Sequence, residues 1–340
     1  MLNNLDSIIA TKNLEQYIDQ PPTAYPTSYV ARSLIPIPIP DLTGLITRLY
    51  QDPIGFGAYG NIYQCVYHGP EGDVQVAVKA IRSQPTNQLP VTFRRELGIW
   101  KRLRHDNILK FMGTTRDFGP FLALVAPWIS HGTLTSFLDK NKTLMQCDRL
   151  LLAAGLDYLH TFSLTIDGHT YSNPIVHGDL TGVINNVLVG SDRTAYLADF
   201  GLSGTLTQLP GMAYLAKKSH RPGAKNRPLQ SPLKSDIYSL GSIMLQILTG
   251  ELPWPHLKRE IAVMVTVSTG NETHPRPDRV TNQQWDFITR CLSKTPMKRP
   301  SAKEALQFVD RELSLLRSSG GGVAADTSSS NNLPFPSSAL

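Results

Sequence analysis

The chain has 340 residues, of which 41% are hydrophobic and 18% charged, a balance typical of a globular protein with one large two-lobed domain or two small ones. Its net charge is +6, but the basic residues are scattered or gathered in short runs such as 217–225, which favours a solvated basic surface over a nucleic-acid site. The cysteines, Cys65, Cys147 and Cys291, form no C-x-x-C pair, so neither a disulfide framework nor a zinc knuckle is indicated.

Nothing in the hydropathy pattern indicates a membrane protein. The longest apolar run, 121–129, is interrupted by Pro127 and is shorter than the roughly 20 residues that span a bilayer. The first residues, MLNNLDSIIATKN, lack the basic start of a secretory signal. We therefore expect a soluble, cytoplasmic protein with no membrane span and no nucleic-acid partner.

The two ends of the chain have compositions that disfavour packing. Residues 1–47 include a Pro21-Pro22 pair and an Ile-Pro alternation over 35–40, which predict an extended arm or linker. Residues 317–340 are rich in glycine and serine and bury too little surface to offset the entropy of ordering, so we expect a disordered tail.

Between these ends, strand-like segments precede helix-like ones. Strands are predicted at 61–67, 74–81 and 121–125. The first predicted helix is 92–103, where large apolar residues recur at helical spacing. A second apolar stripe predicts a buried helix over 236–248.

Two capping boxes mark the starts of later helices. Thr281 is followed three residues on by Gln284, ahead of a helix predicted at 285–292. Ser301 is likewise followed by Glu304, ahead of 306–316.

A glycine-rich turn lies between two strand candidates, one at Ile54 and the other at 61–67. Gly55, Gly57 and Gly60 follow the G-x-G-x-x-G pattern, which lets a backbone fold closely over phosphates. A dinucleotide-binding fold would need a helix directly after the glycines, but 61–67 is strand-like. On this motif alone, a plain hairpin and a nucleotide site are both open.

Lys79 favours the nucleotide site, because it places one cation at the end of the apolar strand 74–81, where it can hold phosphates. Glu96, on the inward face of the helix at 92–103, is its candidate partner. The alternative is that Glu96 is a solvated helix residue paired with Arg94 or Lys101.

Two further motifs follow in order, His177-Gly178-Asp179 and Asp199-Phe200-Gly201. Each tripeptide alone is weak evidence. The glycine-rich turn, the lysine strand and these two motifs in one order point together to phosphoryl transfer from ATP.

With these motifs, residues 48–316 resemble the eukaryotic protein kinases. The resemblance is strongest to the tyrosine-kinase-like branch as found in mushroom-forming fungi, where the opening Asp41-Leu42-Thr43-Gly44 and the His177-Gly178-Asp179-Leu180 form recur. It implies an α+β bilobal fold with a small strand-rich N-lobe, 48–129, and a larger helical C-lobe, 130–316.

The resemblance also implies roles for the polar residues, with ATP and Mg²⁺ as cofactors. Asp179 matches the base that accepts the substrate hydroxyl proton, and Lys79 with Glu96 matches the phosphate-holding ion pair. Asp199 matches the metal-binding aspartate and Asn186 the second metal ligand, although Asn185 is an alternative.

For the base of ATP, the same resemblance implies an apolar slot and a hinge. Ala126 occupies the gatekeeper position, and Asp236 matches the aspartate that steadies the catalytic loop. Plain core packing is the alternative for each apolar position. The expected slot residues are Ile62, Ala77 and Leu188, and the hinge runs from Pro127 to Ile129.

The catalytic loop departs from the family pattern. Gly178 replaces the usual arginine, so a phosphate on the activation segment would lack its usual counter-ion. Thr181 stands where a lysine is common, and the spacing from Asp179 to Asn186 is two residues longer than usual. Such an insertion shifts an extended register by about 6 to 7 Å unless it bulges out.

Further departures lie in the second lobe. Ala216-Lys217-Lys218 replaces the usual Ala-Pro-Glu, so Arg299 is expected to face Lys218 instead of a glutamate. The helix ending at His160 is about one turn short, and the connection 161–174 is long. Natural drift and an error in the deduced sequence are both open explanations.

These observations predict an ATP-dependent protein kinase that acts on protein substrates, with serine/threonine hydroxyls as the expected acceptors. The alternative is a catalytically impaired pseudokinase that serves as a nucleotide-binding scaffold. Ser203, Thr205 and Thr207 are candidate autophosphorylation sites, although ordinary polar loop residues are the simpler interpretation.

Overall fold

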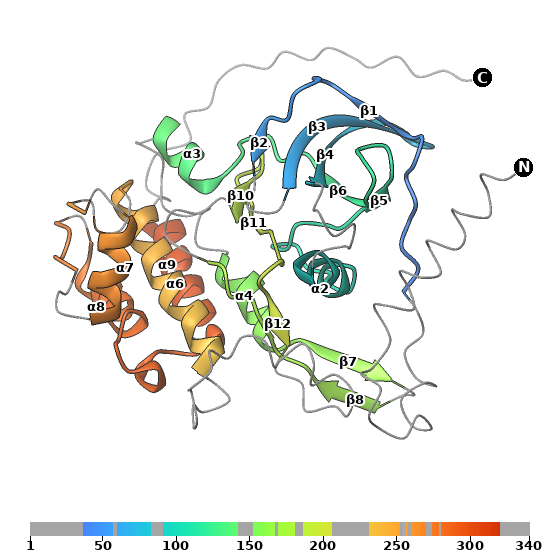
Figure 1. The fold of residues 1–340 in the computed structure, drawn as a ribbon. Coiled ribbons are helices and arrows are strands. Elements are labelled where there is room, and N and C mark those ends of the chain that lie inside the picture. The colour runs from blue at the N-terminus through green and yellow to red at the C-terminus, as the bar shows by residue number, and fades with distance from the viewer. Residues whose placement is uncertain are drawn as a thin grey trace, which may run out of the picture.

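The computed structural model shows two lobes, with strands in the first lobe and mostly helices in the second (Figure 1). It confirms the expected α+β bilobal fold. The residues it describes are 37–56, 60–82, 91–141, 152–166, 169–180, 186–205, 231–251, 254, 256–257, 260–269, 274–278 and 280–319.

The first lobe is a curled antiparallel sheet in the order β1-β3-β4-β6-β5, with β2 paired to β3. The three predicted strands are all present. The third begins two residues later than expected and extends to Pro127, which pairs with Val76. The strands are β1 (Ile46–Arg48), β2 (Gly55–Phe56), β3 (Gly60–Gly69), β4 (Gly72–Ile81), β5 (Gly113–Thr115) and β6 (Ala123–Pro127).

Residues 37–44 lie along the outer edge of this sheet. The Leu42 amide donates to the Thr114 carbonyl over 2.8 Å, and the Thr114 amide donates to the Pro40 carbonyl over 2.9 Å. Leu42 is only 7% exposed and joins the core of the sheet. A Cβ at Gly113, whose φ is +156°, would lie 2.5 Å from the Pro40 carbonyl oxygen, so glycine is needed for this close approach. This segment, the strap, therefore packs as part of the first lobe.

The second lobe is built from helices around α6 (Ser231–Thr249), which begins five residues before the predicted helix. Both predicted capping boxes are present: Thr281 caps α8 (Asn282–Cys291), and Ser301 exchanges hydrogen bonds with Glu304 at the start of α9 (Ala302–Ser319). None of the helices in the described ranges is long and apolar enough to cross a bilayer. The remaining helices are α2 (Val91–Trp100) of the first lobe, α3 (Leu134–Lys140), α4 (Leu152–His160), α7 (Glu260–Thr269) and the short η3 (Pro296–Lys298).

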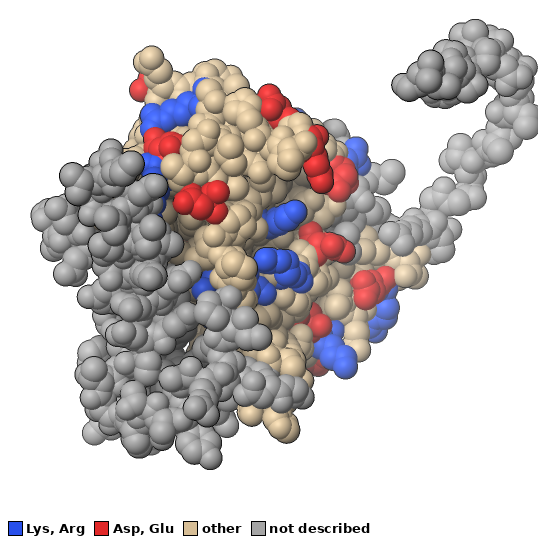
Figure 2. Space-filling view, turned by 90° about the vertical axis from the view of Figure 1, so that its right-hand side faces the viewer, with Lys and Arg blue, Asp and Glu red and all other residues tan. Residues whose placement is uncertain are grey.

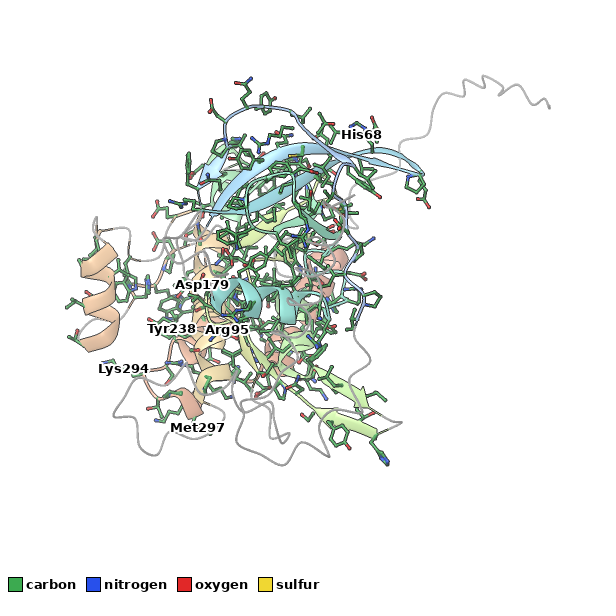
Figure 3. The ribbon with its side chains drawn as sticks, turned by 45° about the vertical axis from the view of Figure 1, so that its right-hand side comes forward. His68, Arg95, Asp179, Tyr238, Lys294 and Met297 are labelled. Atoms are coloured by element: carbon green, nitrogen blue, oxygen red, sulfur yellow. The ribbon has the colours of Figure 1, made fainter. Side chains whose placement is uncertain are left out.

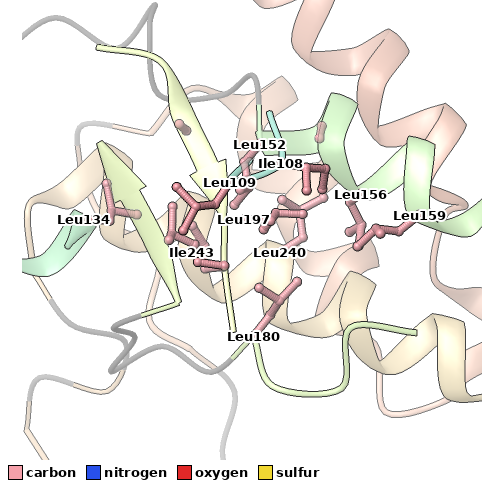
Figure 4. Packing of buried hydrophobic residues seen from close by; sticks show 14 of the residues in the cluster. Ile108, Leu109, Leu134, Leu152, Leu156, Leu159, Leu180, Leu197, Leu240 and Ile243 are labelled. Atoms are coloured by element: carbon pink, nitrogen blue, oxygen red, sulfur yellow. The ribbon is translucent and has the colours of Figure 1, made fainter. Parts of the chain in front are cut away.

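One buried cluster runs from α2 through the second lobe, and Figure 4 shows part of its packing. Leu156 on α4 and Leu240 on α6 are buried in it, as is Leu197 on β11 (Ala195–Leu197). β11 pairs with β10 (Val187–Val189). This core supports the loops that carry the polar residues between the lobes.

The long connection after α4 forms a hairpin. β7 (Ser163–Ile166) pairs with β8 (His169–Ser172), and the Asn173 amide then donates to the Phe162 carbonyl over 2.8 Å. β9 (Ile175–Val176) follows at once and pairs with β12 (Gly204–Thr205). The hairpin therefore ends directly at the strand that leads into His177.

Candidate active site

Lys79, Glu96 and Asp199 meet between the lobes. Lys79 lies on β4, and its Nζ is 2.7 Å from Glu96 Oε1 on α2 and 3.0 Å from Asp199 Oδ2. The carboxylate of Glu96 is nearly buried, whereas that of Asp199 is 37% exposed. The alternative that Glu96 is a solvated residue paired with a neighbour on its own helix is therefore wrong.

Burial and charge together set the ionisation of this cluster. Burial alone would lower the pKa of Lys79, but the charges of Glu96 and Asp199 outweigh it and raise that pKa. Burial raises the pKa of Glu96 to about 7, and the Lys79 ammonium counteracts that rise. An ammonium held between two carboxylates is ready to bind the oxygens of a polyphosphate.

Asp199 has an unusual backbone conformation. Its φ is +60°, in the left-handed region where aspartate and asparagine are the most tolerant of the non-glycine residues. The Gly201 amide donates to its Oδ1 over 3.2 Å. Strain of this kind is common where a chain holds a functional side chain.

Phe200, next to Asp199, is fully buried in a row of aromatic rings that sequence reasoning did not predict. Its ring centroid lies 6.2 Å from that of Trp100 and 5.2 Å from that of His177. Trp100 in turn lies 5.4 Å from Phe111. The apolar stripe of α2 included Trp100, but no sequence pattern indicated that this ring would meet Phe200. The row joins the helix that carries Glu96 to the loop that carries Asp179.

Asp236 lies near the beginning of α6 and, as expected, binds the start of the catalytic loop. Its Oδ2 accepts from the His177 amide over 2.8 Å, and its Oδ1 accepts from the Gly178 amide over 2.9 Å. His160 Nε2 lies 3.0 Å from the same carboxylate. Burial lowers the pKa of His177, which keeps its ring neutral, with Nε2 positioned 3.0 Å from the Ala198 carbonyl oxygen as a donor.

Asn186 lies against Asp179, the candidate base. Asp179 is labelled in Figure 3, at the height where the two lobes meet. The Nδ2 of Asn186 is 2.9 Å from both the backbone oxygen and the carboxylate Oδ2 of Asp179. Burial raises the pKa of Asp179, while this hydrogen bond opposes the rise. Asn185 and Thr181 lie outside the described residues.

The expected base-binding residues come from facing strands. Gly55 pairs with Ile62, and Ala77 pairs with Ala126 beside the start of the hinge at Pro127. Leu188 bridges to Thr133, which follows the hinge residue Ile129 along the chain. A Cβ at Gly60 would lie 2.5 Å from the Ala80 carbonyl oxygen, so only glycine fits there. Gly57 lies outside the described residues.

The donor set near Asp199 suits a hard divalent cation. The carboxylate of Asp199 and the side-chain oxygen of Asn186 are the oxygen ligands that Mg²⁺ prefers. Because Asn186 turns its amide nitrogen to Asp179, its oxygen is the atom that a cation would use. These residues therefore fit the expected Mg²⁺.

Arg299 is held by backbone oxygens in the second lobe. Its Nε donates to the Ser293 carbonyl over 2.8 Å, and its Nη1 donates to the Lys234 carbonyl over 2.7 Å. Its guanidinium also lies over the Tyr238 ring, 5.0 Å from the centroid. Lys218, which Arg299 was expected to face, lies outside the described residues, as do the other residues of 216–218.

Two of the three candidate autophosphorylation hydroxyls are buried. Ser203 is 0% exposed and donates to the His177 carbonyl over 2.8 Å. Thr205 is 5% exposed and pairs with Ile175. Thr207 lies outside the described residues. In this conformation neither described hydroxyl is accessible to a phosphate donor.

Charges of both signs alternate on the face in Figure 2. Lysine and arginine side chains lie among aspartate and glutamate side chains there, without a broad field of one sign among the described residues. This mixture agrees with a solvated surface on that face.

Comparisons with known proteins agree with this geometry. A family model described as protein tyrosine and serine/threonine kinase matches residues 49–309. The chain is 33% identical over 266 residues to the serine/threonine-protein kinase CTR1 of Arabidopsis thaliana. The matched region covers 74% of this chain and 30% of that protein.

Two other relatives match over a similar region. Mitogen-activated protein kinase kinase kinase A of Dictyostelium discoideum is 26% identical over 271 residues, which is 75% of this chain and 26% of that protein. The probable serine/threonine-protein kinase SIS8 of Arabidopsis thaliana is 31% identical over 297 residues, which is 83% of this chain and 26% of that protein. The chain thus spans less than a third of the length of these three relatives.

Proposed function

This chain belongs to the protein tyrosine and serine/threonine kinase family, and we propose that it transfers the γ-phosphoryl group of Mg-ATP to hydroxyls of a protein substrate. Serine/threonine hydroxyls are the proposed acceptors, because two of the relatives named above are serine/threonine-protein kinases and the third is a mitogen-activated protein kinase kinase kinase. We further propose, on the motifs 41–44 and 177–180, that it belongs to the tyrosine-kinase-like branch as found in mushroom-forming fungi.

The observation that carries the proposal is the position of Lys79. Its ammonium contacts Glu96 and Asp199 together, at 2.7 and 3.0 Å, so the phosphate-holding and metal-holding residues already lie in one site. Little reorganisation is then required when the nucleotide binds. A preformed arrangement of charged groups is the main source of catalysis in phosphoryl transfer.

The roles follow from the chemistry of each side chain. Lys79 holds phosphate oxygens, and Glu96 fixes the position of Lys79. Asp199 and Asn186 would hold Mg²⁺, which neutralises phosphate charge when bound. Asp179 accepts the proton of the substrate hydroxyl on a carboxylate oxygen, while the hydroxyl oxygen bonds to the γ-phosphorus and the bond from that phosphorus to the β–γ bridging oxygen breaks, releasing ADP.

A nucleotide-binding scaffold without turnover is the second candidate function. Gly178 supports it, since no arginine is present beside Asp179 to pair with a phosphorylated activation segment. The longer spacing between Asp179 and Asn186 supports it as well. The contact between these two residues favours activity instead.

Phosphoryl transfer from Mg-ATP tests the proposal, with the protein itself and a generic basic protein as acceptors and Asp179→Asn as the matched control. Transfer by the wild-type chain that is lost in the variant supports a working kinase. Absence of transfer from both proteins, when both are folded and bind nucleotide, would support the scaffold.

A further inference from the structure

One peptide group in the catalytic loop is held at both of its polar ends. The carbonyl oxygen of His177 accepts from Ser203 Oγ over 2.8 Å. The amide of Gly178, on the other side of the same peptide bond, donates to Asp236 Oδ1 over 2.9 Å. The next residue along the chain is Asp179.

This peptide needs an external restraint because it precedes a glycine. Gly178 has φ +77°, and glycine populates both signs of φ with little cost, so its backbone is soft. A Cβ at this position would lie 3.0 Å from the Leu202 carbonyl oxygen. Rotation at Gly178 would move the Asp179 carboxylate relative to the substrate. A residue with a side chain would restrict that rotation, but position 178 is a glycine.

Ser203 belongs to the segment that starts with the metal-binding aspartate. Its amide donates to the Phe200 carbonyl over 3.1 Å, which closes a turn that begins at Phe200, directly after Asp199. The neighbouring Gly204 pairs with Val176, the residue before His177. Ser203 itself is 0% exposed, so water does not compete for its hydroxyl. Its side chain therefore links the Asp199 segment to the Asp179 loop.

We propose that Ser203 is a positioning residue, which fixes the His177–Gly178 peptide and through it the direction of the Asp179 carboxylate. The role rests on the proposed phosphoryl transfer. Ser203 acts through Asp179 and does not touch the nucleotide. It also follows that phosphorylation of Ser203 would break the link and lower activity, because the modified oxygen could no longer donate.

The expected effect is on turnover and not on nucleotide binding. Lys79, Glu96 and Asp199 are held by their own contacts, so Ser203→Ala should leave the KM for ATP within about twofold. A misplacement of about 1 Å at a reacting group can cost about 100-fold in rate. Because Asp236 still holds the Gly178 amide, we expect a smaller loss, about tenfold in kcat.

Thr205→Val is the matched control. Thr205 lies two residues further along the same segment and is also buried, but its hydroxyl has no hydrogen-bond partner in the described part of the chain. Valine has nearly the same shape, so kcat should change by less than twofold. Amide hydrogen exchange of the peptide covering 175–180 adds a second readout: it should become faster in Ser203→Ala and stay unchanged in Thr205→Val.

The outcomes separate the two claims. If the wild-type chain transfers phosphate and Ser203→Ala matches it in kcat and in exchange, the positioning role is wrong. If Ser203→Ala lowers kcat, raises the KM for ATP and also lowers the melting temperature, the residue is only structural and the role is also wrong. If the wild-type chain transfers no phosphate, the proposed function fails, and faster exchange in Ser203→Ala would still support the link. Should Ser203→Ala not fold, Ser203→Cys keeps the volume with only a weak donor and replaces it in the same comparison.

Discussion

Asn186 donates through one amide nitrogen to both the backbone oxygen and the carboxylate of Asp179, at 2.9 Å each. The longer spacing between these residues therefore does not separate them. The contact that orients the candidate base is kept despite the two extra residues in the sequence. We propose Asn186, whose amide contacts Asp179, as the second metal ligand; Asn185 lies outside the described residues.

Replacing the two asparagines separately tests this choice. Asn186→Ala should lower kcat by at least about 100-fold, because the variant loses both the orienting contact to Asp179 and a metal ligand. Asn185→Ala is the matched control and should keep activity within about threefold. The measurement is phosphoryl transfer at saturating Mg-ATP. A large loss in Asn185→Ala with normal activity in Asn186→Ala would reverse the assignment.

The sequence predicted the pair of Lys79 and Glu96, and it identified Asp199 separately, because each residue follows a local signal. Lys79 ends an apolar strand, Glu96 lies on the inward stripe of a helix, and Asp199 stands in a short motif. The 2.7 Å contact between Lys79 and Glu96 follows from the strand and the helix that these patterns predict, whereas the 3.0 Å contact of Asp199 with Lys79 was not predicted.

Contacts made by tertiary packing could not be predicted in this way. The tilted packing of the Phe200 ring against His177 and Trp100 depends on how three separate segments meet. The strap at 37–44 was predicted as part of a linker, because its prolines favour an extended chain. An extended chain is also the conformation that pairs with a sheet edge, so the local sequence did not distinguish a linker from a segment packed on the sheet.

Asp199 should be required for metal-dependent nucleotide binding. Asp199→Asn is preferred to alanine, because asparagine tolerates the φ of +60° found here. The variant should lose most of the gain in ATP affinity that Mg²⁺ provides, while Asp179→Asn should keep it. Isothermal titration with and without Mg²⁺ measures this difference. Equal Mg²⁺ dependence in wild type and Asp199→Asn would refute the metal assignment.

Activity should fall as the pH is lowered from 8 toward and through 7. Burial raises the pKa of Asp179 and raises that of Glu96 to about 7, so both carboxyls protonate at a higher pH than ordinary side chains. Both must be ionised, Asp179 to accept a proton and Glu96 to hold Lys79, so the rate is lost on the acid side. A profile of kcat/KM between pH 5.5 and 9, with the melting temperature followed at each pH, tests this. A flat profile in a folded protein would contradict it.

The strap should stabilise the first lobe. Leu42 is 7% exposed in the core of the sheet, so Leu42→Ala should lower the free energy of unfolding by about 2 to 4 kcal/mol. Leu45, which is 41% exposed three residues later, provides the matched control, and Leu45→Ala should cost less than about 1 kcal/mol. Chemical denaturation of both variants measures the difference. Equal losses would mean that the strap contributes no more than a solvated arm.

Arg299 should stabilise the second lobe without a carboxylate partner. Its guanidinium donates to the carbonyls of Ser293 and Lys234, and Lys234 Nζ donates back to the Arg299 carbonyl over 2.7 Å. A lysine at 299 cannot reach both oxygens in the same geometry, so Arg299→Lys should cost about 1 to 3 kcal/mol. Arg290, whose exposed pair with Asp286 is 3.5 Å long, is the control, and Arg290→Lys should cost less than about 0.5 kcal/mol. If both variants unfold at the same denaturant concentration as the wild type, the backbone contacts of Arg299 do not stabilise this region. They would then not replace the glutamate that the family's Ala-Pro-Glu motif usually supplies.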